Sequence, residues 1–402
     1  MRRVPKAWQL AIALTLLAAT AKTQGAYQSP LLAPSGEYKV GRTHFEWIDN
    51  SREESENRGH RREVIVWVWY PASPKSADAE TAEWMPGKWG EYFSSIFVAD
   101  HPDAASDAKE HPIRSIRTHA YADAPAASAK HPFPVLLFAP GLGSTPLDYG
   151  SLIEDVVSHG YIVAAIVPTY YARVSLFSDG RVIEGLDIRA IQAGPGGRGP
   201  RTVEHALQRM QEVVEVWSND LSFTLKQLEK VNADAQSPLK EHFDFGRIGA
   251  IGHSMGGAAV LQVGHDDARV RAVFDIDGSP IWNGANGPLA KPLLILSAAS
   301  TPDSYDTVPG GAKPGMHLRL AGSTHPFSKD FLLVPLISQH PSNTNRGRPQ
   351  AAPTIDPKRA IKITQAYIEA FFDRYLNGQT VALLKGPSPE YPEIMFERGS
   401  EK

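Results

Sequence analysis

The sequence predicts an α/β fold with a mostly parallel central sheet and helices on both of its faces. Continuous apolar runs at 134–139 and 161–167 are typical of strands that are buried on both sides of a parallel sheet. Segments 152–159 and 203–231 carry apolar residues three and four positions apart, which indicates amphipathic helices. Because strands and helices alternate, the strands are expected to form one mostly parallel sheet.

Further elements continue this alternation toward both ends of the chain. Short β-branched, aromatic or aliphatic runs predict five more strands, at 63–71, 247–251, 270–276, 292–296 and 316–320. An amphipathic helix at 361–376 is expected to close the fold before Asn377 and Gly378. Residues 22–60 are polar and turn-rich, and their charged stretch 51–56 is expected to be a solvated loop without a function.

Composition and charge exclude several classes of protein. The 402 residues are 42% hydrophobic and 21% charged, which is close to an average globular protein and unlike a disordered chain or a long coiled coil. With no cysteine, the chain has no disulfide, no thiolate metal site and no cysteine nucleophile. The net charge of −3 argues against a broad nucleic-acid interface, which needs a basic face.

The first 21 residues have the pattern of a secretory signal peptide. Three basic residues precede the apolar run 7–19, and Ala19-Thr20-Ala21 supplies a small-residue cleavage site. That run is shorter than the about 20 apolar residues that span a bilayer, and an uncleaved anchor is the alternative. Cleavage would leave 22–402 with a net charge of −6, as a secreted or periplasmic protein. This part is expected to be a single domain with insertions near 72–130, 171–202 and 330–356.

The strongest local signal is the turn Gly252-His253-Ser254-Met255-Gly256, between an expected strand and a helix-compatible segment. It matches the Gly-x-Ser-x-Gly nucleophile elbow, a tight turn that lifts a serine hydroxyl above the sheet edge. The glycines are needed because side chains at their positions would clash across the turn. An ordinary Gly-rich turn with a capping serine is the alternative. The motif therefore predicts an α/β-hydrolase fold with Ser254 as the nucleophile.

A serine nucleophile needs a general base that a third group holds in place. In this fold the chain order is serine, acid, histidine, so the base lies after Ser254. His325 follows the last core strand and is preferred over the other downstream histidines, which are His265, His317 and His340. For the acid, Asp277 and Asp303 each follow a predicted strand, and the local pattern leaves the two nearly even.

Two backbone N–H groups must stabilise the charge that develops on the substrate during acyl transfer. One is expected from Met255, directly after the nucleophile. The other is expected from Leu142, in the turn 140–144 after the first core strand, where flanking glycines allow the backbone to approach a substrate. A plain β-turn is the alternative for 140–144.

Several segments also share a pattern with one known family. They are 69–71 (WYP), 137–143 (LFAPGLG), 158–165 (SHGYIVAA), 251–258 (IGHSMGGA), 271–277 (RAVFDID) and 320–325 (LAGSTH). In these segments, which run in register from about Val64 to His325, the chain resembles the platelet-activating factor acetylhydrolases of the plasma, lipoprotein-associated type and their bacterial relatives.

That resemblance implies a calcium-independent serine esterase that acts on short or oxidised sn-2 acyl chains. The family's functional residues fall on positions already singled out, namely Ser254, His325, Asp277, Leu142 and Met255. The resemblance thereby selects Asp277 over Asp303. The chain departs from the family at Pro140 and Met255, where the family commonly has His and Phe, and in two poorly matching regions that would shape the acyl pocket, 171–202 and 330–356.

The expected partner is a small-molecule or lipid ester substrate, with no nucleic acid. A general carboxylesterase or polyester hydrolase of the same fold is one alternative, and a catalytically silent binding protein is another, although such proteins usually lack a triad member. No cofactor or metal is expected, because the chain has no His-Glu-x-x-His or comparable cluster. Transient contact with a membrane or lipid surface would use the apolar runs 96–98 and 331–333, which buried helix faces explain equally well. The sequence indicates no oligomeric state.

Overall fold

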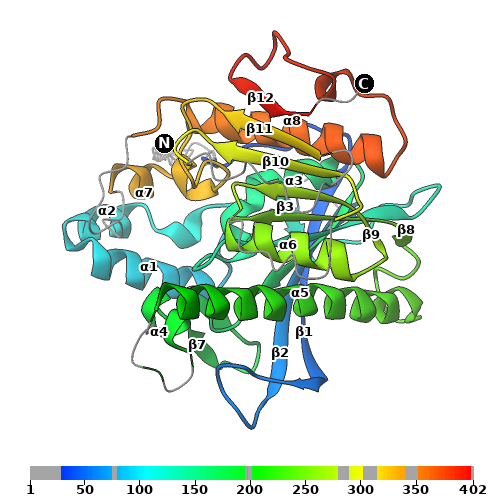
Figure 1. Cartoon of the computed structure of the whole chain (residues 1–402). Helices are drawn as coiled ribbons and strands as arrows, with labels where there is room; N and C mark the ends of the chain where they lie inside the picture. Colours follow the sequence, from blue (N-terminus) through cyan, green and yellow to red (C-terminus); the bar gives the residue numbers. More distant parts are fainter. Residues whose placement is uncertain are drawn as a thin grey trace, which may run out of the picture.

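The structure is a computed structural model that describes residues 29–74, 79–194, 197, 202–278, 289–301, 315–340 and 352–399. Its centre is a ten-stranded sheet in the order β12-β11-β10-β9-β8-β4-β5-β2-β1-β3 (Figure 1). The strands of this sheet are β1 (Lys39–Glu53), β2 (Arg61–Ala72), β3 (Ala120–Ala122), β4 (Phe133–Ala139), β5 (Ile162–Val167), β8 (Phe243–His253), β9 (Val270–Ile276), β10 (Leu293–Ala298), β11 (Gly315–Leu320) and β12 (Ile394–Arg398).

Eight α-helices lie in the described residues, together with a separate two-stranded sheet. The helices are α1 (Lys88–Asp100), α2 (Ala105–Glu110), α3 (Gly150–Ser158), α4 (Ile188–Ala193), α5 (Val203–Ala233), α6 (Met255–Asp266), α7 (Pro335–Gln339) and α8 (Pro357–Tyr375). The small sheet is formed by β6 (Val174–Leu176) and β7 (Val182–Glu184), which pair antiparallel.

The order of the strands reverses at the centre of the sheet. The six neighbouring strands from β11 to β5 run parallel, whereas β2 is antiparallel to β5 and β12 is antiparallel to β11. After β4 the chain moves to β5 on one side, and later it returns as β8 on the other side of β4. Loops that leave two such strands diverge, and α/β proteins bind ligands in the resulting crevice at the carboxyl ends.

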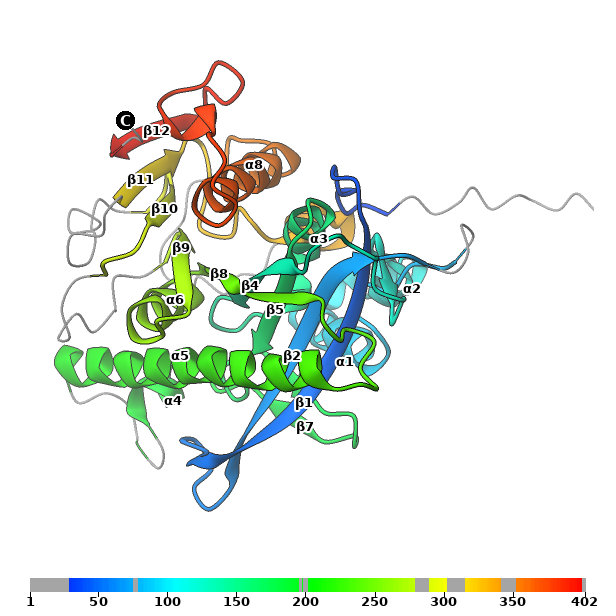
Figure 2. The ribbon, with the colours of Figure 1, turned by 90° about the vertical axis from the view of Figure 1, so that its right-hand side faces the viewer.

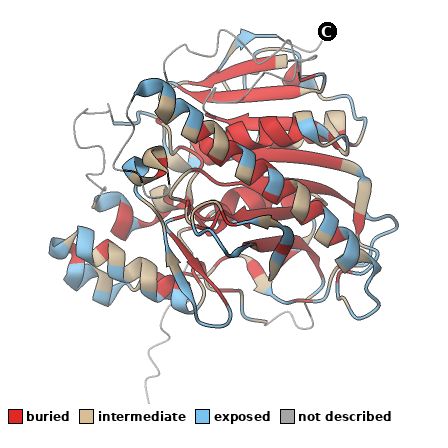
Figure 3. Ribbon diagram, turned by 60° about the horizontal axis from the view of Figure 1, so that its bottom comes forward, coloured by how far each residue is buried: buried red, intermediate tan, exposed pale blue. Residues whose placement is uncertain are grey.

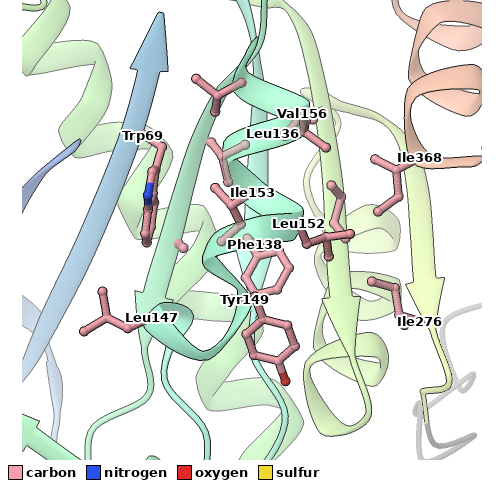
Figure 4. Packing of buried hydrophobic residues seen from close by; sticks show 14 of the residues in the cluster. Trp69, Leu136, Phe138, Leu147, Tyr149, Leu152, Ile153, Val156, Ile276 and Ile368 are labelled. Atoms are coloured by element: carbon pink, nitrogen blue, oxygen red, sulfur yellow. The ribbon is translucent and has the colours of Figure 1, made fainter. Parts of the chain in front are cut away.

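Helices cover both faces of the sheet. Helices α3 and α8 pack together on one face, and α5 and α6 pack on the other (Figure 2). In Figure 3 the central strands are buried along their length, while the long helices expose one side. Trp69, Phe138, Leu152 and Ile368 belong to the apolar cluster on the α3 and α8 face (Figure 4). Among the described residues, no helix has both the length and the apolar character needed to cross a bilayer.

The predicted fold class is confirmed, since the sheet is mostly parallel and is covered on both faces. All seven predicted strands and all three predicted helices are present, with ends that differ from the prediction by at most four residues. The region 72–130 carries two short α-helices, α1 and α2, and the edge strand β3.

The prediction of a turn-rich segment at 22–60 was wrong for its second half. Residues 39–53 form β1, a strand of 15 residues that pairs antiparallel with β2. Much of this strand is partly exposed, so polar residues interrupt its apolar ones and the signal in the sequence is diluted. The structure also contains β6, β7 and α4 within 171–202, and it adds β12 to the edge of β11, none of which the apolar pattern predicted.

The charged stretch 51–56 is not simply solvated. Arg62, which is buried, donates to Glu54 Oε2 at 2.7 Å and to Asp220 Oδ2 at 2.6 Å. Arg52 donates to Asp220 Oδ1 at 2.8 Å, so Asp220 on α5 holds the end of the β1–β2 hairpin. Removing one partner from such a buried pair leaves an uncompensated charge and typically costs about 3–5 kcal/mol.

Candidate active site

Ser254 occupies a strained turn between β8 and α6. Its backbone has a φ of 57°, in the left-handed region, which a non-glycine residue adopts only at a cost. The turn is closed by glycines, because a Cβ on Gly252 would lie 2.1 Å from the Gly256 carbonyl oxygen. A Cβ on Gly256 would lie 2.1 Å from the carbonyl oxygen of Ala139, the last residue of β4. Bare backbone at both positions is therefore what allows the nucleophile elbow to form.

His325 connects Ser254 to Asp277. Its Nε2 lies 2.9 Å from Ser254 Oγ, and its Nδ1 lies 2.5 Å from Asp277 Oδ2. A carboxylate only accepts hydrogen bonds, so Nδ1 carries the ring proton and Nε2 is left to accept the Ser254 hydroxyl. The three side chains come from the ends of β8, β9 and β11, which the parallel sheet brings to one edge.

Asp277 is buried at the end of β9 and is held by its neighbours. Its Oδ1 accepts the Ala298 N–H at 2.8 Å, and its Oδ2 accepts the Thr301 hydroxyl at 2.9 Å. Arg319 in turn donates to the Thr301 carbonyl at 2.8 Å, which fixes the loop after β10. The structure thus joins Asp277 to the candidate base, while the alternative acid Asp303 lies outside the described residues.

A second carboxyl group, on Asp275, lies close behind the elbow. Burial, and then the charge of Asp277, raise the pKa of Asp275 well above its ordinary value. Its Oδ1 sits only 2.0 Å from the position that a Cβ on Gly257 would occupy and 2.1 Å from that of Gly278. Of the two carboxyl groups, Asp277 is the one that contacts His325.

A second imidazole, that of His253, packs against the candidate base. The ring centroids of His253 and His325 are 4.7 Å apart, and His253 Nε2 lies 2.9 Å from the His325 carbonyl oxygen. Burial, then the neighbouring charges of His325 and Lys329, lower the pKa of His253 well below its ordinary value. Sequence reasoning missed this residue, although it is the first variable position of the elbow motif.

The two expected oxyanion donors lie at the start of α6 and in the turn after β4. Met255 is the first residue of α6, and the first N–H groups of an α-helix have no partner within the helix. Leu142 lies in the turn after β4, which is closed by a hydrogen bond from the Ser144 N–H to the Gly141 carbonyl at 3.0 Å. Gly143 has a φ of 73° and donates to the Tyr171 carbonyl at 2.8 Å, so this turn is anchored as well.

The remaining downstream histidines have other contacts. His317 is buried within β11, where its Nε2 lies 2.8 Å from the Ser297 hydroxyl. His265 contacts Asp266 at the end of α6, and His340 lies 3.4 Å from Asp103. In the described part of the chain, no group of three or more His, Asp or Glu side chains could hold a metal ion.

Comparison with known proteins shows which family has this fold and this sequence pattern. A Streptomyces cinnamoneus protein whose structure is titled a ferulic acid esterase matches with a TM-score of 0.69 and 26% identity, over 92% of this chain and 99% of that chain. The family model for platelet-activating factor acetylhydrolase, isoform II, matches residues 24–380. The fold, the elbow and these matches define an ester hydrolase of the α/β-hydrolase class. The chain belongs to the platelet-activating factor acetylhydrolase isoform II family.

Two relatives of known name match most of the chain. A protein of Arthroderma benhamiae named a probable 1-alkyl-2-acetylglycerophosphocholine esterase is 26% identical over 90% of this chain and 92% of its own length. The platelet-activating factor acetylhydrolase of Gallus gallus is 24% identical over 77% of both chains. The family resemblance predicted from the sequence is thereby confirmed.

The close contact at Gly256 can be tested by adding one methyl group. Gly256→Ala is expected to lower kcat/KM by about 100-fold or more, because the new Cβ forces the elbow away from β4 and displaces Ser254. Overpacking of this kind should also destabilise the fold by about 1–3 kcal/mol. Ester hydrolysis and urea denaturation measure the two effects.

Gly386→Ala is the matched control, since a Cβ at Gly386 meets no atom within 4 Å. It should leave both activity and stability close to those of the parent chain. An active Gly256→Ala protein of unchanged stability would show that the elbow does not depend on this contact.

Proposed function

We propose that the protein hydrolyses esters through an acyl-enzyme formed on Ser254, with His325 as general base and Asp277 as the acid of the triad. The observation that supports this is the continuous series of hydrogen bonds from Ser254 Oγ through the His325 ring to Asp277 Oδ2. A serine hydroxyl is a weak nucleophile until an adjacent base takes its proton, and here the base is already oriented.

In the first half of the reaction, Ser254 Oγ attacks the ester carbonyl carbon and its proton passes to His325 Nε2. The tetrahedral oxyanion is stabilised by the N–H groups of Leu142 and Met255. When the C–O bond to the leaving alcohol breaks, His325 gives that alcohol its proton. Asp277 stays ionised throughout and stabilises the imidazolium.

In the second half, a water molecule replaces the alcohol. His325 takes one proton from the water as its oxygen attacks the acyl carbon, and then returns that proton to Ser254 Oγ as the carboxylic acid leaves. Ester and water are consumed and alcohol and acid are formed, with no redox change and no cofactor in the balance.

The substrate that we propose is a short or oxidised acyl chain at the sn-2 position of a phospholipid. Membership of the family and the name of the Arthroderma benhamiae relative support this choice. A general carboxylesterase is the second candidate, and the match to nearly the whole of the Streptomyces ferulic acid esterase favours it. The departures at Pro140 and Met255 lie beside the acyl-transfer site, where they would alter acyl selectivity.

We also propose that the chain is exported and that its first 21 residues are removed. The basic start, the short apolar run and the Ala19-Thr20-Ala21 end support this. The mature protein, recovered from the medium or periplasm, is expected to begin within a few residues of Lys22. An intact Met1 on a membrane-bound protein would indicate an uncleaved anchor instead.

Substitution of the triad tests the mechanism directly. Ser254→Ala is expected to lower kcat by about 10⁴-fold or more, because no acyl-enzyme forms. Asp277→Asn is expected to cost about 10³- to 10⁴-fold, because the His325 ring loses its orienting carboxylate. Single-turnover and steady-state hydrolysis of a nitrophenyl ester measure these losses, with thermal melting as the check on folding.

Asp303→Asn is the matched control for the acid and should change kcat less than twofold. A larger loss in Asp303→Asn than in Asp277→Asn would assign the acid to the loop after β10. A fully active Ser254→Ala protein would overturn the mechanism altogether.

Substrate choice can be measured with a series of esters in one assay. The series contains phosphatidylcholines whose sn-2 chain is acetyl, butanoyl, hexanoyl or a long acyl group. It also contains two simple esters, nitrophenyl acetate and methyl ferulate. For the phospholipids, kcat/KM is expected to fall by at least about 10-fold from the acetyl to the long-chain member, since a pocket discriminates each added methylene. Activity on the aryl and ferulate esters alone, with none on the sn-2 acetyl phospholipid, would favour the general carboxylesterase.

A further inference from the structure

Buried polar side chains continue from the candidate triad into the loop after β4. Tyr149, at the end of the short helix Pro146–Tyr149, is buried, and its hydroxyl points away from the apolar cluster around Phe138 (Figure 4). This hydroxyl lies 2.9 Å from His253 Nδ1 and accepts the Gly141 N–H at 3.0 Å. The ester-hydrolysis steps described above do not use Tyr149.

The chain of contacts ends at a lysine. Ser144, in the same loop as Gly141, accepts from Lys329 Nζ at 2.7 Å. Lys329 Nζ also lies 5.7 Å from the centroid of the Tyr149 ring and 5.7 Å from that of Phe331. Lys329 follows His325 by four residues, and Ser144 follows Leu142 by two. The polar side chains therefore link the loop that carries the base to the loop that carries an oxyanion donor.

The chemistry of the groups fixes the direction of every hydrogen bond. The His325 carbonyl only accepts, so His253 carries its proton on Nε2, and its Nδ1 accepts the Tyr149 hydroxyl. The Tyr149 oxygen in turn accepts the Gly141 N–H. An ammonium group only donates, so Ser144 accepts from Lys329.

We propose that Lys329, Ser144 and Tyr149 are positioning residues that hold the oxyanion loop 141–144 and the base loop 325–329 in register, with His253 as the bridge between them. Neither loop can shift without breaking a hydrogen bond, and the buried partner that remains, Ser144 or His253, would be left unsatisfied. Asp330, the next residue, gives a second anchor, because it accepts the Ser151 N–H at 3.1 Å. This inference rests on the proposed triad and oxyanion donors.

The lysine also makes the link sensitive to pH. Burial lowers the pKa of Lys329 to about 8, while the charge of Asp148 raises it and that of Arg173 lowers it. Asp148 faces Lys329 from the helix after the oxyanion loop, and Arg173 from the segment before β6. The neutral His253 lies within reach of the same charge. An ammonium group is the stronger donor, so the link to Ser144 weakens as the pH rises through about 8.

Two substitutions test the proposal in the full-length chain. Tyr149→Phe removes the hydroxyl that serves Gly141 and His253, and Lys329→Met removes the charge. Each is expected to lower kcat for nitrophenyl acetate by about 10- to 100-fold while KM changes less than twofold, because a misplaced donor and base act on the transition state. The parent chain is expected to lose activity above about pH 8, and Lys329→Met should show no such alkaline decline.

Matched controls separate positioning from folding. Tyr70→Phe removes a buried hydroxyl that donates to the Ala124 carbonyl, and Lys291→Met removes a lysine that donates to the Asp267 carbonyl, both away from the site. These controls should keep kcat and the pH profile of the parent whatever they do to the melting temperature. Should Lys329→Met fail to fold, Ser144→Ala removes only one oxygen from the same link and should lower kcat in the same way.

Two results would overturn the inference. The first is that Tyr149→Phe and Ser144→Ala both keep a kcat within twofold of the parent value. The second is that Lys329→Met still loses activity above about pH 8, as the parent does. Ser254→Ala in the same assay keeps this test apart from the proposed function. An inactive Ser254→Ala with a fully active Tyr149→Phe rejects the link alone, whereas an active Ser254→Ala rejects the triad.

Discussion

The whole site depends on how closely α6 begins beside the end of β4. The Gly256 backbone is so near the Ala139 carbonyl that no side chain fits between them. This approach aims Ser254 over the sheet edge and brings its helix under the loop after β4. The strain in the Ser254 backbone is held by contacts on several sides, including the hydrogen bond from its N–H to the Ile276 carbonyl at 3.0 Å.

Burial disfavours the charged forms of the two ionisable side chains that lie beside the candidate triad, Asp275 and His253. Burial is the main cause that raises the pKa of Asp275 and lowers the pKa of His253. Asp277 receives hydrogen bonds from the next loop and faces His325. The His325 ring therefore lies between one carboxyl group and one neutral imidazole.

The parts of this arrangement that could be predicted are those that one short segment determines. The elbow around Ser254 is local, because its glycines and its strand-to-helix context lie within a few residues. The buried strands are likewise recognised as continuous apolar runs. The choice between Asp277 and Asp303 depends on how two loops approach His325, and local sequence left it open. Tyr149 and Lys329 acquire their partners only when loops far apart in the chain meet, so no spacing reveals them. The strand β1 was missed because it lies near the edge of the sheet, where polar and apolar residues alternate irregularly along a strand.

The two edges of the sheet affect how readily the protein aggregates with other copies of itself. Unpaired backbone along a straight outer strand invites a second chain to add to it. Here β3 covers only Val40–Arg42 of β1, but the register of β1 shifts between Asp49 and Glu53, and Glu53 is exposed. At the other end, β12 is five residues long, ends in Glu397 and Arg398, and has its own register shift against β11. Edge strands that are short, irregular and charged oppose edge-to-edge aggregation. This matters in a protein that has no disulfide to restrain its unfolding.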